Sequence, residues 1–177
     1  KEFIKNDIKN EDFIICEIGG TVGDIESLPF IEAIRQFSND VGKKNTLFIH
    51  LTLVPYMRAS DEIKTKPTQH SVKELRSIGI KPDLIVGRST ISLDDDVREK
   101  IALFCDVPTK AVFSNPDLDD IYYLPMSLAE ESLDEYVMEK LNLLDRALPL
   151  SNRDTTWFES VTAPTHDKVN IALIGKY

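Results

Sequence analysis

Short apolar runs alternate with stretches of helical periodicity along this chain, and that alternation constrains its fold more than any other feature. Four of the runs predict buried strands, because each is almost continuously apolar and ends at glycine, proline or a polar turn. These runs are residues 13–18, 47–54, 83–87 and 111–113. The helical patterns cover residues 28–41, 68–78, 97–104, 118–130 and 133–143. Strands that alternate with helices predict an α/β fold, with a mostly parallel sheet flanked by helices.

The charge balance of the chain limits its possible partners. The 177 residues carry 30 acidic and 21 basic side chains, for a net charge of −9. This balance argues against nucleic-acid binding, which draws most of its affinity from a basic face. The apolar runs are too short to span a membrane, so we expect no membrane partner. Cys16 and Cys105 lie in apolar runs and are expected in the core, which suits a reducing cytoplasm.

The α/β pattern ends near residue 145, and this change predicts the domain organisation. Residues 1–145 form one predicted domain, and the proline-containing residues 146–168 predict an interdomain linker. Residues 169–177 predict the first strand of another domain. Because the sequence starts without methionine and stops after a strand-like segment, we expect it to be part of a longer protein.

A glycine-rich segment follows the first predicted strand and places a carboxylate, Glu17, near the carboxyl end of that strand. Glycines allow a ligand to approach the backbone, and the next helix offers unpaired N–H groups. A buried carboxylate is unfavourable unless it is paired or binds a cation, so Glu17 is a candidate Mg²⁺ ligand. The alternative is a structural turn, with Asp24 as helix N-cap and Glu17 in a salt bridge. The residues alone leave both interpretations open.

A second candidate site lies where Lys64 and Lys66 flank a turn that leads into a predicted helix. Cations at the positive end of a helix dipole are unfavourable, which favours an anion bound between them. The alternative is a solvated loop in which Thr68 or Ser71 caps the helix.

Several other polar groups carry weaker signals. Residues 94–96 are all aspartate and predict the start of a helix rather than a metal site. Arg88 and residues 115–118 follow predicted strands, at the edge of the sheet where ligands bind in such folds. Arg88 could instead pair with a carboxylate, and residues 115–118 could form a simple turn. The three histidines show no metal-ligand spacing.

Two long motifs, residues 17–30 and 64–75, closely resemble signature sequences of the CTP synthase family. Residues 100–105 and 174–177 also match, in the order found in that family. The resemblance covers nearly the whole chain and implies the second half of a P-loop-type, dethiobiotin-synthetase-like amidoligase domain, followed by a linker and the first strand of a glutaminase domain. In the family the P-loop and a second magnesium-binding aspartate lie in the first half. The present sequence has no GxxxxGK[ST] motif, so we expect it to be inactive alone.

The resemblance implies a ligase of pyrimidine biosynthesis that converts UTP to CTP. ATP phosphorylates the uracil O4 atom, and ammonia derived from glutamine then displaces that phosphate. Mg²⁺ is the implied cofactor and ATP the co-substrate. CTP is the implied feedback inhibitor, and GTP the allosteric activator that acts through the glutaminase domain. The family forms homotetramers whose pyrimidine site lies between subunits.

The same resemblance assigns roles to individual residues. Glu17 is implied as a Mg²⁺ ligand and, with Lys64, as catalytic. Residues Pro116, Asp117 and Leu118 match a stretch near the ATP base. The implied contacts to UTP or CTP are Asp24, Ile25, Glu26, Lys64, Thr65, Lys66, Pro67, Thr68, Gln69 and Lys100.

Two other functions are compatible with these motifs. The first is another ATP-dependent amidoligase, such as a dethiobiotin synthetase relative. The paired lysines argue against it, because its substrates are not triphosphates. The second is a non-catalytic module that senses pyrimidine nucleotides or forms filaments. A P-loop upstream of Lys1 would favour the enzyme over this second alternative.

Overall fold

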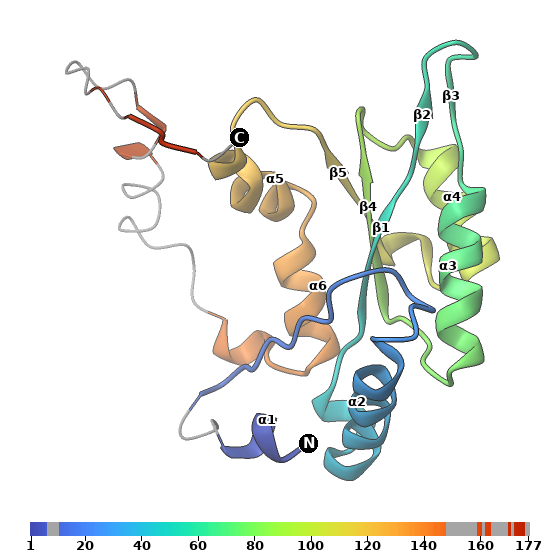
Figure 1. Cartoon of the computed structure of the whole chain (residues 1–177), viewed down its shortest axis with the longest axis vertical. Coiled ribbons are helices and arrows are strands. Elements are labelled where there is room, and N and C mark those ends of the chain that lie inside the picture. Colours follow the sequence, from blue (N-terminus) through green and yellow to red (C-terminus); the bar gives the residue numbers. More distant parts are fainter. Residues whose placement is uncertain (7–10, 148–158, 161, 164–169, 171, 176–177) are drawn as a thin grey trace.

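The computed structural model of this protein places its helices and strands as Figure 1 shows. It describes residues 1–6, 11–147, 159–160, 162–163, 170 and 172–175. The smaller elements are α1 (Glu2–Asn6) and the 3-10 helices η1 (Lys43–Asn45), η2 (Thr109–Ala111), η3 (Ile121–Tyr123) and η4 (Leu144–Arg146). Within these ranges, no helix combines the length and apolar character needed to cross a membrane.

A parallel sheet of three strands forms the centre of the fold. Its strands are β1 (Ile49–Leu53), β4 (Leu84–Ser89) and β5 (Val112–Pro116), in the order β1-β4-β5. Parallel neighbours need a crossover between them. Helix α3 (Lys66–Ser77) connects β1 to β4, and α4 (Asp95–Cys105) connects β4 to β5. The carboxyl ends of all three strands therefore meet at one edge of the sheet, beside the starts of the crossover helices.

Helices cover both faces of this sheet. In Figure 1, α3 and α4 lie on one side, and α5 (Leu124–Glu130) and α6 (Leu133–Lys140) lie on the other. The central strand supplies the deepest side chains, since Leu84 and Ile85 are fully buried. The ring of Phe113 on β5 packs edge-on against Tyr136 of α6, with 5.5 Å between centroids. The core is therefore centred on β4 and β5.

A second, smaller core lies near the amino ends of the strands. Helix α2 (Leu28–Val41) contributes Ile31, which packs with Leu75 of α3 and with Ile80. Ile18 and Val22, from the segment that precedes α2, cover this cluster. The glycine-rich segment is thereby held against the second half of α3.

A short antiparallel hairpin separates β1 from α3. Strands β2 (Tyr56–Met57) and β3 (Glu62–Ile63) pair with each other, and the Tyr56 hydroxyl donates a hydrogen bond to Asp61 at 2.6 Å. After the hairpin, the Lys64 N–H group donates to the Pro55 carbonyl at 2.8 Å. The segment between β1 and α3 is thus held by backbone hydrogen bonds and leads directly into α3.

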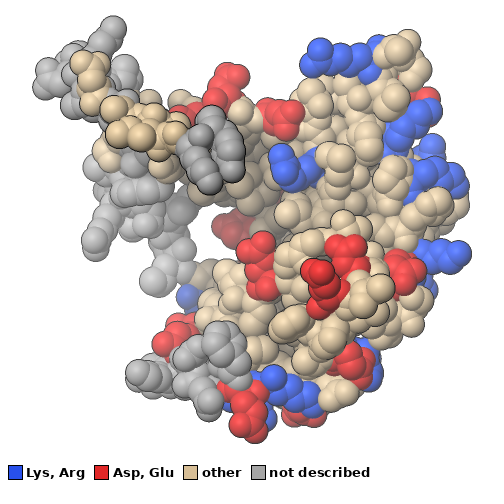
Figure 2. Space-filling model, in the orientation of Figure 1, with Lys and Arg blue, Asp and Glu red and all other residues tan. Residues whose placement is uncertain are grey.

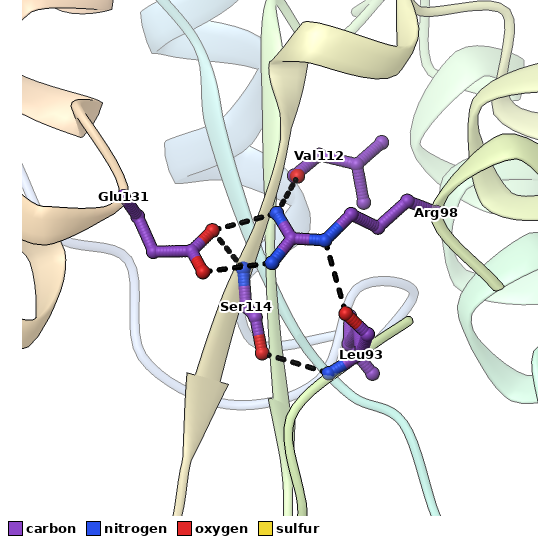
Figure 3. A network of polar contacts seen from close by, with 5 residues as sticks. All are labelled: Leu93, Arg98, Val112, Ser114 and Glu131. Atoms are coloured by element: carbon purple, nitrogen blue, oxygen red, sulfur yellow. Dashed lines mark hydrogen bonds and ion pairs between the residues drawn. The ribbon is translucent and has the colours of Figure 1, made fainter. Parts of the chain in front are cut away.

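An ion pair between Arg98 of α4 and Glu131 at the end of α5 ties these helices to β5 (Figure 3). The Arg98 guanidinium also donates to the Val112 carbonyl at 3.0 Å and to the Leu93 carbonyl at 3.1 Å. Glu131 in turn accepts the Ser114 N–H group at 3.1 Å. The bonds to Val112 and Ser114 satisfy backbone groups of β5, an outer strand of the sheet that pairs only with β4 among the described strands.

The predicted α/β class and mostly parallel sheet are confirmed. Three of the four predicted strands form, and the helices form within a few residues of their predicted bounds, except that α5 begins at Leu124 instead of residue 118. Asp94 caps α4 by accepting the Val97 N–H group at 2.8 Å, as its sequence predicts. The predicted linker, 146–168, lies mostly outside the described residues. The described part of 169–177 contains no strand.

The predicted strand at residues 13–18 is wrong. No residue of this run belongs to a strand, and its apolar side chains are largely exposed, with Ile15 at 95%. Cys16, predicted in the core, is exposed as well, whereas Cys105 is buried as predicted. An apolar pattern favours an extended backbone, but a strand also needs a neighbour for its N–H and C=O groups. None of the described strands pairs with this segment.

Candidate functional site

The lysine loop, residues 64–69, lies beside the carboxyl end of β1 and starts helix α3. Its short polar side chains face inward: Thr65, Thr68 and Gln69 are all buried. Gln69 donates to the Thr65 hydroxyl at 3.0 Å, and Thr68 donates to the Leu53 carbonyl at 3.4 Å. The first bond lies within the loop, and the second ties the loop to β1. The three predicted ligand contacts are therefore placed to hold the loop in position.

The charged side chains of the loop face outward and lie close to α4. Lys64 forms an ion pair with Glu62 of β3. The Lys66 ammonium lies 5.4 Å from the centroid of the Phe104 ring on α4, one turn beyond Lys100. In Figure 2, Lys and Arg atoms follow the side of the molecule that α3 and α4 occupy in Figure 1. Three predicted contacts to UTP or CTP, Lys64, Lys66 and Lys100, thus share one region of the surface.

The hydrogen bond from Lys64 holds the pKa of Glu62 below its usual value. Lys64 and Lys100 add a Coulombic attraction in the same direction. This places Lys100 of α4 within electrostatic range of the hairpin carboxylate. Neither Glu62 nor Phe104 is singled out by the sequence, because the motif contains no sign that the preceding residues form a strand or that α4 packs beside them.

The first turn of α3 adds a positive helix end to this region. It contains no acidic residue, and the side chain of the N-cap residue Thr65 makes no capping hydrogen bond. Pro67 occupies one of the first helical positions, where its missing N–H group is tolerated. Since nothing within the first turn neutralises the helix dipole, the geometry suits an anion.

The glycine-rich segment is organised as a tight turn around Asp24. Its carboxylate accepts the Thr21 N–H group at 2.9 Å, and its carbonyl accepts the Ser27 hydroxyl at 2.9 Å. Gly20 has a φ of +86°, a conformation that favours glycine. Asp24 therefore stabilises the turn and does not cap α2, whose N-cap is Ser27. The next two predicted contacts, Ile25 and Glu26, are exposed.

This turn and the lysine loop lie at opposite ends of α3. A Cβ atom added to Gly23 would lie 3.2 Å from the Glu74 side chain, in the last turns of the helix. Lys66 is the first residue of α3, eight positions earlier. At about 1.5 Å per residue, the two segments are roughly 12 Å apart along the helix axis. The described part of the chain does not bring them together around one ligand.

Glu17 is exposed and lies in a segment without regular structure, so its predicted burial at a strand end is wrong. The described residues also contain no cluster of three or more His, Cys, Asp or Glu side chains that could hold a metal. Pro116 ends β5, and the Asp117 N–H group donates to the Ser89 carbonyl at 2.9 Å. The predicted base-contacting stretch therefore lies at the carboxyl edge of the sheet, as expected for ligands in this fold.

Comparison with known proteins identifies the family of this chain. Residues 1–143 match the family model described as CTP synthase N-terminus. The chain belongs to this CTP synthase family. Curated CTP synthases of Pelagibacter ubique, Haloarcula hispanica and Methanocaldococcus jannaschii are 59%, 55% and 53% identical to it, each over 100% of the chain. The chain spans only 32–33% of the length of these CTP synthases.

Proposed function

We propose that this chain forms the part of a CTP synthase that binds the triphosphate of UTP and of the inhibitor CTP. The observation that carries the proposal is that Lys64 and Lys66 lie at the start of α3, beside the part of α4 that carries Lys100. Three ammonium groups beside a positive helix end offer a complement to a polyphosphate. The buried threonines and glutamine of the loop keep its backbone in place, so binding requires little loss of conformational entropy.

The pyrimidine site is proposed to be shared between subunits of a homotetramer. Two observations support this arrangement. Residues 24–26 and the lysine loop lie at opposite ends of α3, and Ile25 is 84% exposed. A second copy of the chain could bring its exposed turn to the lysine loop of the first, so that one nucleotide contacts both segments. Asp24 would then act mainly through the turn that it stabilises.

The reaction that we propose for the whole enzyme is the ATP-dependent amination of UTP, with glutamine or ammonia as nitrogen donor and GTP as activator. Glu17 is the proposed Mg²⁺ ligand of this chain. A single exposed carboxylate fits Mg²⁺, which takes one or two carboxylates and completes its coordination with phosphate oxygens and water. When bound, Mg²⁺ offsets the negative charge of the transferred phosphoryl group. Residues 116–118 are the proposed neighbours of the ATP base, in a P-loop-type domain of a cytoplasmic enzyme.

The test is a chimera in which this chain replaces the matching segment of the Pelagibacter ubique CTP synthase. CTP formation is followed from UTP, ATP, Mg²⁺ and ammonia, because ammonia bypasses glutamine hydrolysis. We expect turnover in the chimera and its loss in Glu17→Ala. Lys66→Ala should raise KM for UTP about ten- to a hundredfold, the usual effect of losing a charged hydrogen bond. Lys110→Ala, which removes a lysine remote from the loop, is the matched control and should change neither parameter.

Two results would contradict the proposal. If Lys66→Ala and Lys110→Ala have the same KM for UTP, the lysine loop does not bind the triphosphate. If the folded chimera binds UTP and CTP but makes no CTP, the chain acts as a nucleotide-sensing module instead of an enzyme segment.

A further inference from the structure

The hairpin that precedes the lysine loop holds a carboxylate beside the proposed phosphate donors. Glu62 begins β3 and Lys64 directly follows this two-residue strand, and the two side chains form an ion pair. Backbone contacts fix both: β3 pairs with β2, and the Lys64 N–H group bonds the Pro55 carbonyl at 2.8 Å. Their ion pair therefore follows from the local fold of the hairpin.

This carboxylate lies among cations. Lys64 donates a hydrogen bond to it, and Lys100 of α4 attracts it from a greater distance. Lys66, the other lysine of the loop, lies over the Phe104 ring instead. Of the two loop lysines, Lys64 is thus the one already engaged by a negative charge of the chain itself.

We infer that Glu62 is an internal counter-ion of the anion site, which occupies Lys64 until a phosphate group displaces it. The inference rests on the proposed triphosphate site. An incoming phosphate must take the ammonium group away from Glu62 and then remain close to that carboxylate. Both effects oppose binding, so Glu62 lowers the affinity of the site below what its three lysines would provide.

The exposure of the Lys64–Glu62 pair to water determines how far Glu62 lowers the affinity for phosphate. The Lys64 and Glu62 side chains are 44% and 50% exposed, so water screens the pair and its strength is modest. An exposed pair of this kind corresponds to about a two- to fivefold change in an equilibrium constant. Glu62 therefore adjusts the affinity and does not block the site, which keeps nucleotide binding readily reversible.

The experiment is a double-mutant cycle on the full 177-residue chain, with inorganic tripolyphosphate as the probe. Dissociation constants are measured by calorimetry for the wild type, Glu62→Gln, Lys64→Gln and the double variant, after circular dichroism has shown that all four are folded alike. Glu139→Gln is the matched control: its pair with Lys110 has comparable exposure, 52% and 62%, on a different part of the molecule.

We expect Glu62→Gln to tighten tripolyphosphate binding about two- to fivefold, and this gain to disappear in the Lys64→Gln background. Glu139→Gln should leave the affinity unchanged. If the wild type binds and Lys64→Gln weakens binding, while Glu62→Gln has no effect, the counter-ion role is overturned but the anion site stands. If the gain is equal in both backgrounds, Glu62 acts as a distant charge and the displacement is refuted. If neither the wild type nor Glu62→Gln binds, the anion site itself is refuted.

Discussion

Removing the carboxylate of Glu131 should destabilise the fold much more than removing an exposed carboxylate. Glu131 receives two hydrogen bonds from Arg98, at 2.6 and 2.7 Å, and one from the Ser114 N–H group (Figure 3). Glu131→Ala would leave a half-buried guanidinium without its partner and a backbone donor of β5 unsatisfied. Breaking a fully buried pair costs about 3–5 kcal/mol. Because these side chains remain 20% and 23% exposed, we expect about 2–3 kcal/mol.

The measurement is urea unfolding of the chain followed by far-ultraviolet circular dichroism. The free energy of unfolding typically falls by about 1–3 kcal/mol per molar urea, so the midpoint should fall by roughly 0.7–3 M in Glu131→Ala. Glu139→Ala removes a carboxylate from a pair that is more than half exposed and should cost at most about 1 kcal/mol. Replacing both members of the network, with Arg98→Met and Glu131→Leu, should cost less than the sum of the single changes.

The pH dependence of this network has a defined sign. The hydrogen bond from Arg98 is the main reason that the pKa of Glu131 lies below its ordinary value of 4.5. A lowered folded-state pKa means that the stabilisation is complete above pH 4.5 and is lost as the pH falls through that lower value.

If Glu131→Ala and Glu139→Ala unfold at the same urea concentration at pH 7, the reasoning from burial and hydrogen bonding is refuted.

Two further predictions concern the core. Gly87→Ala should lower the free energy of unfolding by about 1–3 kcal/mol, because the added methyl group would lie 2.8 Å from the buried Leu93 side chain. An unchanged midpoint of urea unfolding would contradict this prediction. Burial lowers the pKa of His50 below its ordinary value of 6.5, so stability should decline as the pH falls through 6.5 and be restored above it. His50→Gln should remove that decline in stability. The control His70→Gln, which changes an exposed histidine, should retain it. Equal pH profiles of stability for the two variants would refute the role of His50.

Local sequence signals predicted much of the fold. Strands β4 and β5 begin as short apolar runs that lead into polar turns, and the three aspartates at residues 94–96 supply the N-cap of α4 and its first two residues. Each signal concerns neighbours in the chain, so it could be recognised without knowing the packing. The segment at residues 13–18 shows the limit of this approach. Its apolar pattern was identified correctly, but whether such a run becomes a strand depends on a partner outside the local sequence.

Part of the candidate site, like part of the fold, could be predicted from the sequence, and the rest could not. The two lysine-loop cations and the start of α3 were predicted from the motif itself. The hairpin strands β2 and β3 are only two residues long, which is too short for a periodic signal. The contact between Lys66 and Phe104 joins residues of different helices, and no sequence pattern indicates it.

The sequence by itself therefore determined most of the order of the elements, the parallel sheet and the position of the loop for which we propose phosphate binding. Only the tertiary structure decided that Glu62 engages Lys64, that Lys100 lies near them, and that the turn around Asp24 lies at the far end of α3. The physical reason is the range of the forces. Periodicity and capping act between residues a few positions apart, whereas burial, ion pairing and helix packing depend on which distant segments the fold brings together.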